Sequence, residues 1–180
     1  MPSVFSHAVV AIALSQVPTQ KLSRVKLWAL SVSCSVLPDA DVVTFFLGIP
    51  YRDMLGHRGL THSLSFALAI ALLVATLFPE VKRQSKDWWV LFGYFFVVTA
   101  SHGLLDAITN GGLGVAFFAP FDETRYFLPW RPIEVSPIGL DFFGPEGLGV
   151  IRSELVWLWI PSALLAIVVW ACKRLQTPVP

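Results

Sequence analysis

Four histidines and three aspartates carry most of the chemistry that this sequence could perform. They are His7, Asp39, Asp41, His57, His62, His102 and Asp106. Imidazole nitrogens and carboxylate oxygens together bind divalent ions such as Zn²⁺, Mn²⁺ or Fe²⁺. A catalytic ion of this kind keeps one position open and lowers the pKa of bound water to about 7. Seven groups exceed the needs of one ion, so the sequence predicts one or two ions, with zinc favoured.

The spacing of these residues gives a second reason to group them. His57 and His62 flank Arg58 in a seven-residue polar stretch that runs directly into an apolar segment. His102 and Asp106 are four residues apart, which places them on one face of a helix. Polar groups at the mouth of an apolar segment are costly near a membrane and commonly mark a functional site.

Each residue receives an expected role. All seven are candidate metal ligands, and either Asp41 or Asp106 is the candidate general base. Arg58 and Arg125 are expected to hold an anionic group of the substrate through paired hydrogen bonds, and Arg58 is therefore counted with the catalytic residues. Thr61 and Ser63 are expected to orient the ligands.

Every local feature also has a purely structural interpretation. His102 and Asp106 suit a hydrogen-bonded pair in helix packing, and His7 a polar helix end. Asp39 and Asp41 suit a helix cap, and residues 57–62 a polar loop near lipid headgroups. The charged residues of the later loop suit local ion pairs. Cys34 and Cys172 lie far apart in apolar runs, so they predict neither a disulfide nor a thiolate metal site.

Composition indicates the elements that must position these groups. The chain has 180 residues, of which 55% are hydrophobic and 14% charged, against about 25% charged in a soluble domain. These values predict one integral membrane domain over residues 1–180, with an all-α bundle of four to five membrane segments. The net charge of +1 gives no basis for binding nucleic acid.

The apolar segments are expected at residues 4–17, 27–47, 60–78, 88–108 and 155–172. Pro38 interrupts the second segment, so a helix is expected up to about Val36, followed by a break. This break is expected to direct the side chains of Asp39 and Asp41 into a protected cavity. A helix starting at Gly59 or Thr61 would place His62 in its first turn. Residues 111–153, rich in proline, glycine and aromatic side chains, are expected to form an irregular cap or interfacial loop.

Positive charges predict how the segments cross the membrane. They gather in three clusters, at Lys21, Arg24 and Lys26, at Lys82, Arg83 and Lys86, and at Lys173 and Arg174. Alternating crossings bring the three clusters to one face, which the positive-inside rule makes cytoplasmic. The opposite, extracytoplasmic face then receives all seven candidate ligands and the aromatic loop. This coincidence is the main argument for one joint metal site.

Several blocks of this sequence resemble those of a known family. Ser6-His7, Leu37-Pro38-Asp39-Ala40-Asp41, His57 to Ser63 and His102 to Thr109 look like the signature blocks of YdjM-type membrane-bound metal-dependent hydrolases of bacteria and archaea. Ala119-Pro120-Phe121 and Asp141 are similar to that family's later part, so the resemblance covers about residues 1 to 145. It implies an inner-membrane protein and a metal-dependent hydrolase, without naming a substrate. A link to the repressor LexA also belongs to the family's name, and no feature of this sequence supports it.

A more distant similarity concerns the zinc-dependent phospholipase C and P1 nuclease group. The order of an early His, a central Asp, a middle His and a helical His-x-x-x-Asp is similar to the order in that group. This chain lacks the group's N-terminal Trp and its later His-x-x-x-Glu or His-x-x-x-Asp ligands, so a three-ion site is not expected.

The combined hypothesis is a membrane-bound metal-dependent hydrolase that acts at the membrane–water interface on the outer, extracytoplasmic side of the membrane. Its expected partners are membrane lipid and a small or lipid-linked anionic substrate, most simply a phosphoester. The alternatives are a non-catalytic metal-binding or ion-conducting membrane protein and a membrane scaffold that recruits a cytosolic partner. Intramembrane metalloproteolysis is not favoured, because the sequence has no His-Glu-x-x-His motif.

Overall fold

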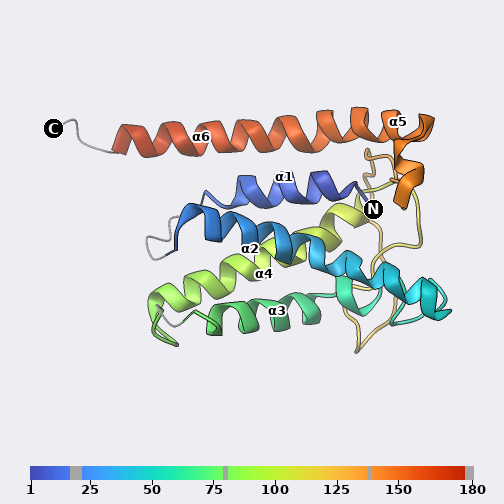
Figure 1. Cartoon of the computed structure of the whole chain (residues 1–180), viewed down its shortest axis with the longest axis horizontal. Coiled ribbons are helices and arrows are strands. Elements are labelled where there is room, and N and C mark those ends of the chain that lie inside the picture. Colours follow the sequence, from blue (N-terminus) through green and yellow to red (C-terminus); the bar gives the residue numbers. More distant parts are fainter. Residues whose placement is uncertain (17–21, 79–80, 138, 177–180) are drawn as a thin grey trace.

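The fold is a bundle of apolar helices. The computed structural model describes residues 1–16, 22–78, 81–137 and 139–176, and within these ranges it has no strand. α1 (Val4–Leu14), α2 (Arg24–Val36), α3 (Leu64–Thr76) and α4 (Lys86–Ala107) pack together. α5 (Pro145–Glu154), a π-helical turn (Leu155–Trp159) and α6 (Ile160–Gln176) form one long rod beside α1, as Figure 1 shows. The predicted all-α membrane bundle is confirmed.

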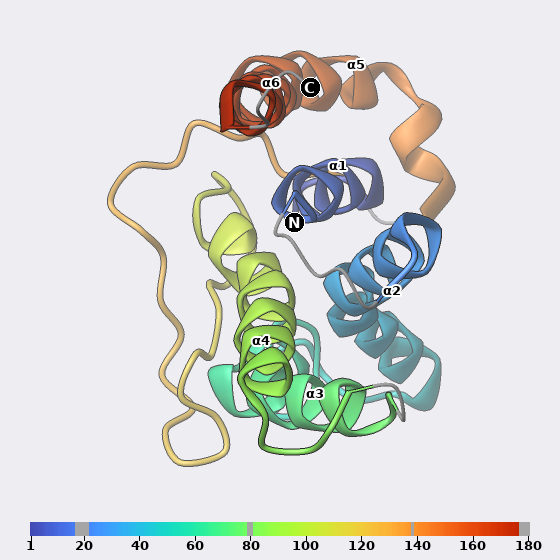
Figure 2. The ribbon, with the colours of Figure 1, turned by 90° about the vertical axis from the view of Figure 1, so that its left-hand side faces the viewer.

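Several helices have the length and composition that a membrane requires. The stretches Arg24–Leu47, Lys86–Ala107 and Pro145–Leu175 are long and apolar enough to cross one, and the shorter α1 and α3 are also apolar. Figure 2, which looks along the helices, shows α1 lying between the α5–α6 rod and the rest of the bundle. The described residues thus contain three apolar helices long enough to cross a membrane and two shorter ones, which is compatible with the expected four to five segments.

Some boundaries differ from the prediction. The last apolar segment begins at Pro145 rather than near residue 155, because proline with its fixed φ starts a helix well. The predicted loop at 111–153 therefore ends in helix, with a 3₁₀ turn (η3, Gly139–Phe143) before α5. His62 was expected in the first turn of α3, but it lies in a separate 3₁₀ turn (η2, Leu60–His62). Ser63 caps α3 instead, its hydroxyl accepting the Phe66 N–H at 3.0 Å.

Small residues allow α3 to pack closely against α4. Ala67, Ala71 and Ala75 recur every four residues on one face of α3, and all three are buried. Ala71 and Ala75 share an apolar cluster with Leu91, Phe95 and other buried α4 side chains. Small side chains of this kind let two membrane helices approach each other closely. Close packing matters there because lipid chains are as apolar as the protein core, so burial of apolar surface alone gives little driving force for helix association.

The ends of the bundle differ in charge. Arg24 and Lys26 begin α2, Lys86 begins α4 and Arg174 lies at the end of α6. These ends lie together on the side of the molecule where Figure 1 marks the C-terminus. The N-terminus and the end of α4 lie on the other side. The predicted gathering of positive charge is thus present in the fold, although Lys21 is outside the described residues.

The irregular segment 111–137 is tied to the end of the bundle that lacks these charges. The Leu128 N–H donates to the Ala107 carbonyl at 2.9 Å, and the Ala116 N–H donates to the Arg58 carbonyl at 3.0 Å. The Leu64 N–H donates in turn to the Phe117 carbonyl at 2.9 Å. These hydrogen bonds hold the segment against the turns that carry His57 and His62.

Candidate metal centre

A break in the second apolar segment places two of the carboxylates. Pro38 has no N–H to continue the α-helical hydrogen bonding, and after Val36 the chain tightens into a 3₁₀ helix (η1, Leu37–Leu47). Asp39 and Asp41 both lie in this helix and both are buried. The sequence prediction of a helix to Val36 followed by a break is confirmed.

Four side chains from three elements converge on one point. Asp39 of η1, His62 of η2, and His102 and Asp106 of α4 each offer one ligand atom, and these atoms lie within 4.8 Å of one another. All four residues are buried. We call this set the four-residue cluster. The number and types of its atoms are those that bind a divalent metal ion.

The backbone fixes the orientation of His102. Its Nδ1 lies 2.6 Å from the carbonyl oxygen of Ser35, so Nδ1 must carry the proton and donate it. Nε2 therefore keeps its lone pair, and it points toward Nε2 of His62 at 3.0 Å. This arrangement, in which the second ring nitrogen donates to a fixed acceptor, is typical of histidines that bind metals.

Asp41 orients two imidazoles. Its Oδ1 lies 2.7 Å from Nδ1 of His57, and its Oδ2 lies 3.1 Å from Nδ1 of His62. Oδ2 also accepts hydrogen bonds from the Thr61 hydroxyl at 2.7 Å and the Arg58 N–H at 3.2 Å. Asp41 was predicted as a ligand and possible base; these contacts occupy both of its oxygens and suit a group that positions ligands.

Three carboxylates surround His62. Burial by itself lowers the pKa of His62, but the close carboxylates of Asp106, Asp39 and Asp41 outweigh burial and raise that pKa to about 10. The carboxylates thus favour a positive charge at this point, which a proton supplies when no metal is bound. A divalent cation would supply it more completely.

The carboxylates of Asp39 and Asp106 have unused bonding capacity. All four oxygens are buried, and none accepts a hydrogen bond from the residues that the structure describes. Buried carboxylates without such partners are costly unless a charge compensates them. Arg58 compensates Asp106 in part, with Nε 3.0 Å from Oδ2, whereas Asp39 contacts only imidazoles. The nearest cluster contacts of the two carboxylates are long, at 3.3 Å from Asp39 Oδ1 to His102 Nε2 and 3.4 Å from Asp106 Oδ2 to His62 Nε2. These oxygens and the facing Nε2 atoms of His62 and His102 fit a divalent ion.

His7 lies beside this cluster. Its ring stacks on the ring of His102 with centroids 3.8 Å apart, and its Nε2 is 3.6 Å from Oδ1 of Asp106. Within the described part of the chain neither of its ring nitrogens has a hydrogen-bond partner. His7 is therefore placed to extend the ligand set on the Oδ1 side of Asp106.

The two arginines predicted to contact substrate are engaged within the protein. Arg58 is fully buried, and its Nε lies 3.0 Å from Oδ2 of Asp106. Its other nitrogens donate to the Gly111 carbonyl at 2.9 Å and to the Thr109 hydroxyl at 3.1 Å. Gly112 leaves room for this guanidinium, since a Cβ there would lie 2.6 Å from Nη1.

Arg125 fastens a turn. Its guanidinium donates to the carbonyl oxygens of His57, Tyr51 and Asp53 at 3.0–3.1 Å. Burial lowers the pKa of Arg125, although the group stays a hydrogen-bond donor in this role. Both arginines thus shape the site's surroundings.

The predicted orienting residues divide in the same way. The Thr61 hydroxyl donates to Oδ2 of Asp41 at 2.7 Å and lies 3.0 Å from Nδ1 of His62, a position from which it could orient this ring. Ser63 instead caps α3. The Ser35 carbonyl that holds His102 was missed, because a backbone acceptor leaves no signal in the sequence.

Comparisons with known proteins match nearly the whole chain. The profile of the family described as YdjM inner membrane protein matches residues 1–176. Inner membrane protein YbcI of Escherichia coli (strain K12) is 37% identical over 176 residues, which cover 97% of this chain and 100% of that protein. No solved structure gives a significant match.

Proposed function

The chain belongs to the YdjM inner membrane protein family, and we propose that it is a metal-dependent hydrolase acting on a phosphoester of a lipid or lipid-linked molecule. It is an integral inner membrane protein with a buried His/Asp cluster that could hold a metal ion. The observation that carries the proposal is the four-residue cluster, in which two carboxylates lack hydrogen bonds from the described residues.

The residues suggest a division of labour. Asp39, His62, His102 and Asp106 would hold the ion, with His7 as a further ligand and Asp41 orienting His62. A divalent ion supplies Lewis-acid polarisation of a phosphoryl group and activates water near neutral pH. With no thiolate in the ligand set, zinc, manganese and iron all remain suitable.

Asp39 is the best placed group to accept a proton from the attacking water. The sequence favoured Asp41 or Asp106 for this role, but Asp41 is saturated by its partners and Asp106 pairs with Arg58. Asp39 contacts the imidazoles through Oδ1, whereas Oδ2 has no partner among the described residues. A free carboxylate oxygen next to the ligands suits general-base catalysis.

The charge distribution supports an extracytoplasmic location of the site. The ends of the bundle that carry Arg24, Lys86 and Arg174 lie opposite the cluster. By the positive-inside rule these ends are cytoplasmic. The reaction would then occur at the outer surface of the inner membrane.

The core below the site gives no support to ion conduction. Leu91, Phe95 and Val98 of α4 lie between the cluster and the cytoplasmic end, and all three are buried in apolar packing. The polar side chains of Ser31, Tyr94 and Thr99, buried at the same level, bond to each other or to backbone carbonyls. An ion path would need polar groups or water along this distance. A hydrolytic site open to one side of the membrane needs none.

Hydrolysis of bis(p-nitrophenyl) phosphate and of phosphatidylglycerol by the purified protein, with and without Zn²⁺ or Mn²⁺, tests the proposal. We expect metal-dependent turnover that falls at least ~100-fold in His102→Ala, since a ligand is lost. Ser101→Ala, at the neighbouring position, should retain it. Metal binding without turnover of either compound would contradict the hydrolase proposal and favour a non-catalytic metal-binding protein.

A further inference from the structure

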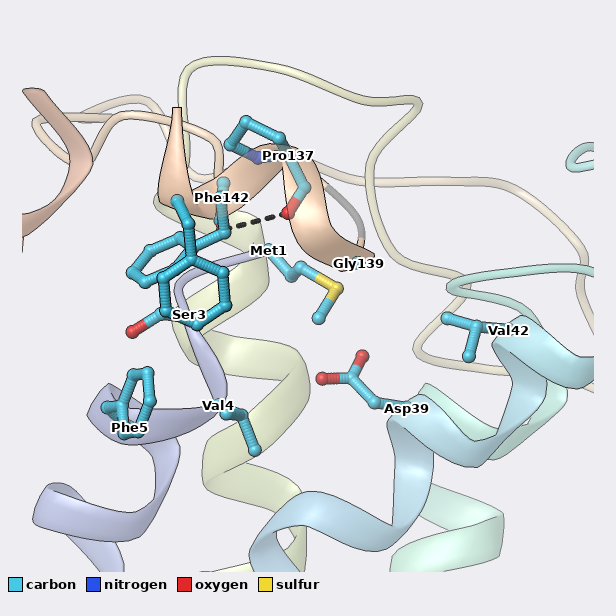
Figure 3. Close-up of a pocket in the computed structure, with 11 residues that line it drawn as sticks. Met1, Ser3, Val4, Phe5, Asp39, Val42, Pro137, Gly139 and Phe142 are labelled. Atoms are coloured by element: carbon cyan, nitrogen blue, oxygen red, sulfur yellow. Dashed lines mark hydrogen bonds between the residues drawn. The ribbon is translucent and has the colours of Figure 1, made fainter. Parts of the chain in front are cut away.

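A pocket of about 290 Å³ opens beside Asp39. Its walls come from the start of α1, from η1 and from the segment that leads into η3. The apolar lining residues include Val4, Phe5, Val42, Pro137, Phe142 and Phe143. Figure 3 shows the carboxylate of Asp39 pointing into this space from η1, with Val42 on the same helix. The volume is close to the lower end of the range for small-molecule sites.

Asp39 is the one polar side chain with free bonding capacity among the described residues that line the pocket. The Ser3 hydroxyl donates to Oε2 of Glu154 at 2.6 Å, and the Ser136 hydroxyl donates to the Pro137 carbonyl at 3.0 Å. Neither lysine nor arginine is among these lining residues. An occupant therefore meets mainly apolar walls, together with the carboxylate of Asp39 and Met1, whose amino group interacts with Asp106 and Asp39.

This carboxylate connects the pocket to the metal centre. Oδ1 of Asp39 lies 3.3 Å from Nε2 of His102 and 3.6 Å from Nε2 of His62. A group bound at the cluster would thus stand at the inner end of the pocket. The rest of the same molecule would extend along the apolar walls.

Several apolar residues that line the pocket are also exposed at the surface. Phe143 of η3 is 76% exposed, and Phe5 and Val4 of α1 are 50% and 43% exposed. Exposed aromatic side chains at one end of a membrane bundle are typical of the lipid–water boundary. Hydrocarbon chains of membrane lipids are available at this level.

We infer that the pocket binds the hydrocarbon chain of an amphiphilic phosphoester and places its phosphate at Asp39 and the metal centre. This inference rests on the proposed function and narrows its substrate to molecules with an apolar chain next to the phosphate. A sugar or nucleoside in the pocket would bury hydroxyl or amide groups without partners, which is costly.

A series of alkylphosphonates from methyl to dodecyl, titrated into the metal-loaded protein in detergent, tests the inference. Phosphonates resemble the phosphoester headgroup and are not hydrolysed. Affinity should rise about fourfold for each methylene that the pocket buries and then level off when the pocket is full. Transfer of the longer chains into detergent affects all variants equally.

Two neighbouring substitutions give a matched comparison. Val42→Trp fills the pocket, whereas Val43→Trp adds the same ring to an exposed position of the same helix, outside the pocket lining. In Val42→Trp the affinity should level off at a shorter chain, with metal content unchanged. If the Val42→Trp protein does not retain metal, Val4→Trp, which fills the pocket from α1, is the alternative variant for this test.

The outcomes separate this inference from the proposed function. Equal affinity for methyl- and dodecylphosphonate in the wild type would overturn the pocket assignment and leave the metal centre intact. The pocket assignment would also be overturned if affinity depended on chain length in the same way in Val42→Trp and Val43→Trp. If no phosphonate of any length binds the metal-loaded protein, both the inference and the hydrolase proposal fail.

Discussion

Asp39 and Asp41 are two residues apart in the sequence but have different partners in the structure. Asp39 joins the four-residue cluster and lines the pocket, whereas Asp41 lies between His57 and His62. A 3₁₀ helix has about three residues per turn, so positions two apart point in directions roughly 120° from each other. The sequence could group the two carboxylates, but their roles depend on this local geometry.

Replacing Asp41 with Asn should weaken metal binding without abolishing it. The amide keeps the size of the side chain but no longer offers two acceptor oxygens to His57, His62 and Thr61. Loss of such an orienting partner typically costs 10–100-fold in metal affinity. Competition with a chelator would measure this, with exposed Asp53→Asn as the control. An unchanged affinity would remove the orienting role.

Replacing Arg58 with Ala should destabilise the whole site. Arg58 has an unusual φ of +63° and is fully buried, with contacts to Asp106, Thr109 and Gly111. Removing one partner of a buried ion pair costs about 3–5 kcal/mol. Thermal unfolding should show this loss together with a lower metal content, while exposed Arg52→Ala should show neither. Normal stability and metal content with poor turnover would instead indicate a direct contact with substrate.

The arginines show where sequence reasoning reached its limit at the scale of single residues. Arg58 stands among histidines in a polar stretch, which suggested that it faces substrate. Its burial depends on two glycines more than fifty residues later: Gly112 leaves space for the guanidinium, and the Gly111 carbonyl accepts its hydrogen bond. Contacts over that distance in the chain could not be derived from local spacing.

At the scale of elements, the α5–α6 rod is attached to α1 by a few polar contacts. Glu154 is fully buried, and its carboxylate accepts hydrogen bonds from both the N–H and the hydroxyl of Ser3. The Trp159 indole donates to the Ser6 hydroxyl at 2.7 Å. Ser6 directly precedes His7, so the rod supports the element that brings His7 to the cluster.

Glu154→Ala should therefore loosen the rod and destabilise the protein. The change leaves the N–H and hydroxyl of Ser3 buried without their acceptor, at a cost of about 1–3 kcal/mol for each unsatisfied group. Unfolding in detergent with increasing dodecyl sulfate would measure the loss. Glu146→Ala, in the exposed first turn of α5, is the matched control. Equal stability of the two variants would show that the rod is held mainly by apolar packing.

Element boundaries were predicted where a residue with a strong local effect sets them. Pro38 ends α2 as expected, and Thr109 to Gly112 follow the end of α4. The early start of the last helix was missed, although Pro145 followed by Glu146 is a favourable beginning. Its residues 145–154 are more polar than a membrane segment, which concealed a helix that continues into the apolar part.

At the scale of the whole molecule, topology brings the site together. The candidate ligands come from four separate parts of the chain, and the sequence predicted their meeting from the positive charges at the opposite ends of the segments. The bundle places Arg24, Lys86 and Arg174 at one end, and His62, His102 and Asp106 toward the other. Helix packing then determines which of the gathered groups touch, and the charge pattern carries no information about that.

The orientation across the membrane can be tested with single cysteines. In a Cys172→Ser background, Phe121→Cys places a thiol on the irregular segment, and Arg83→Cys places one before α4; both positions are exposed. A membrane-impermeant maleimide should label Phe121→Cys in intact spheroplasts and Arg83→Cys only after lysis. The reverse labelling would put the candidate metal centre on the cytoplasmic side.

The most direct test of the account is the metal content of the purified protein, measured by mass spectrometry. The wild type should contain one or two equivalents of a divalent metal, because the buried carboxylate of Asp39 faces the cluster with only imidazole contacts and no hydrogen bond from the described residues. The His62→Ala/His102→Ala double variant should lose it, whereas exposed Asp122→Ala should keep it. Wild-type protein that binds no metal after incubation with Zn²⁺ or Mn²⁺ would contradict the metal centre and the hydrolase proposal with it.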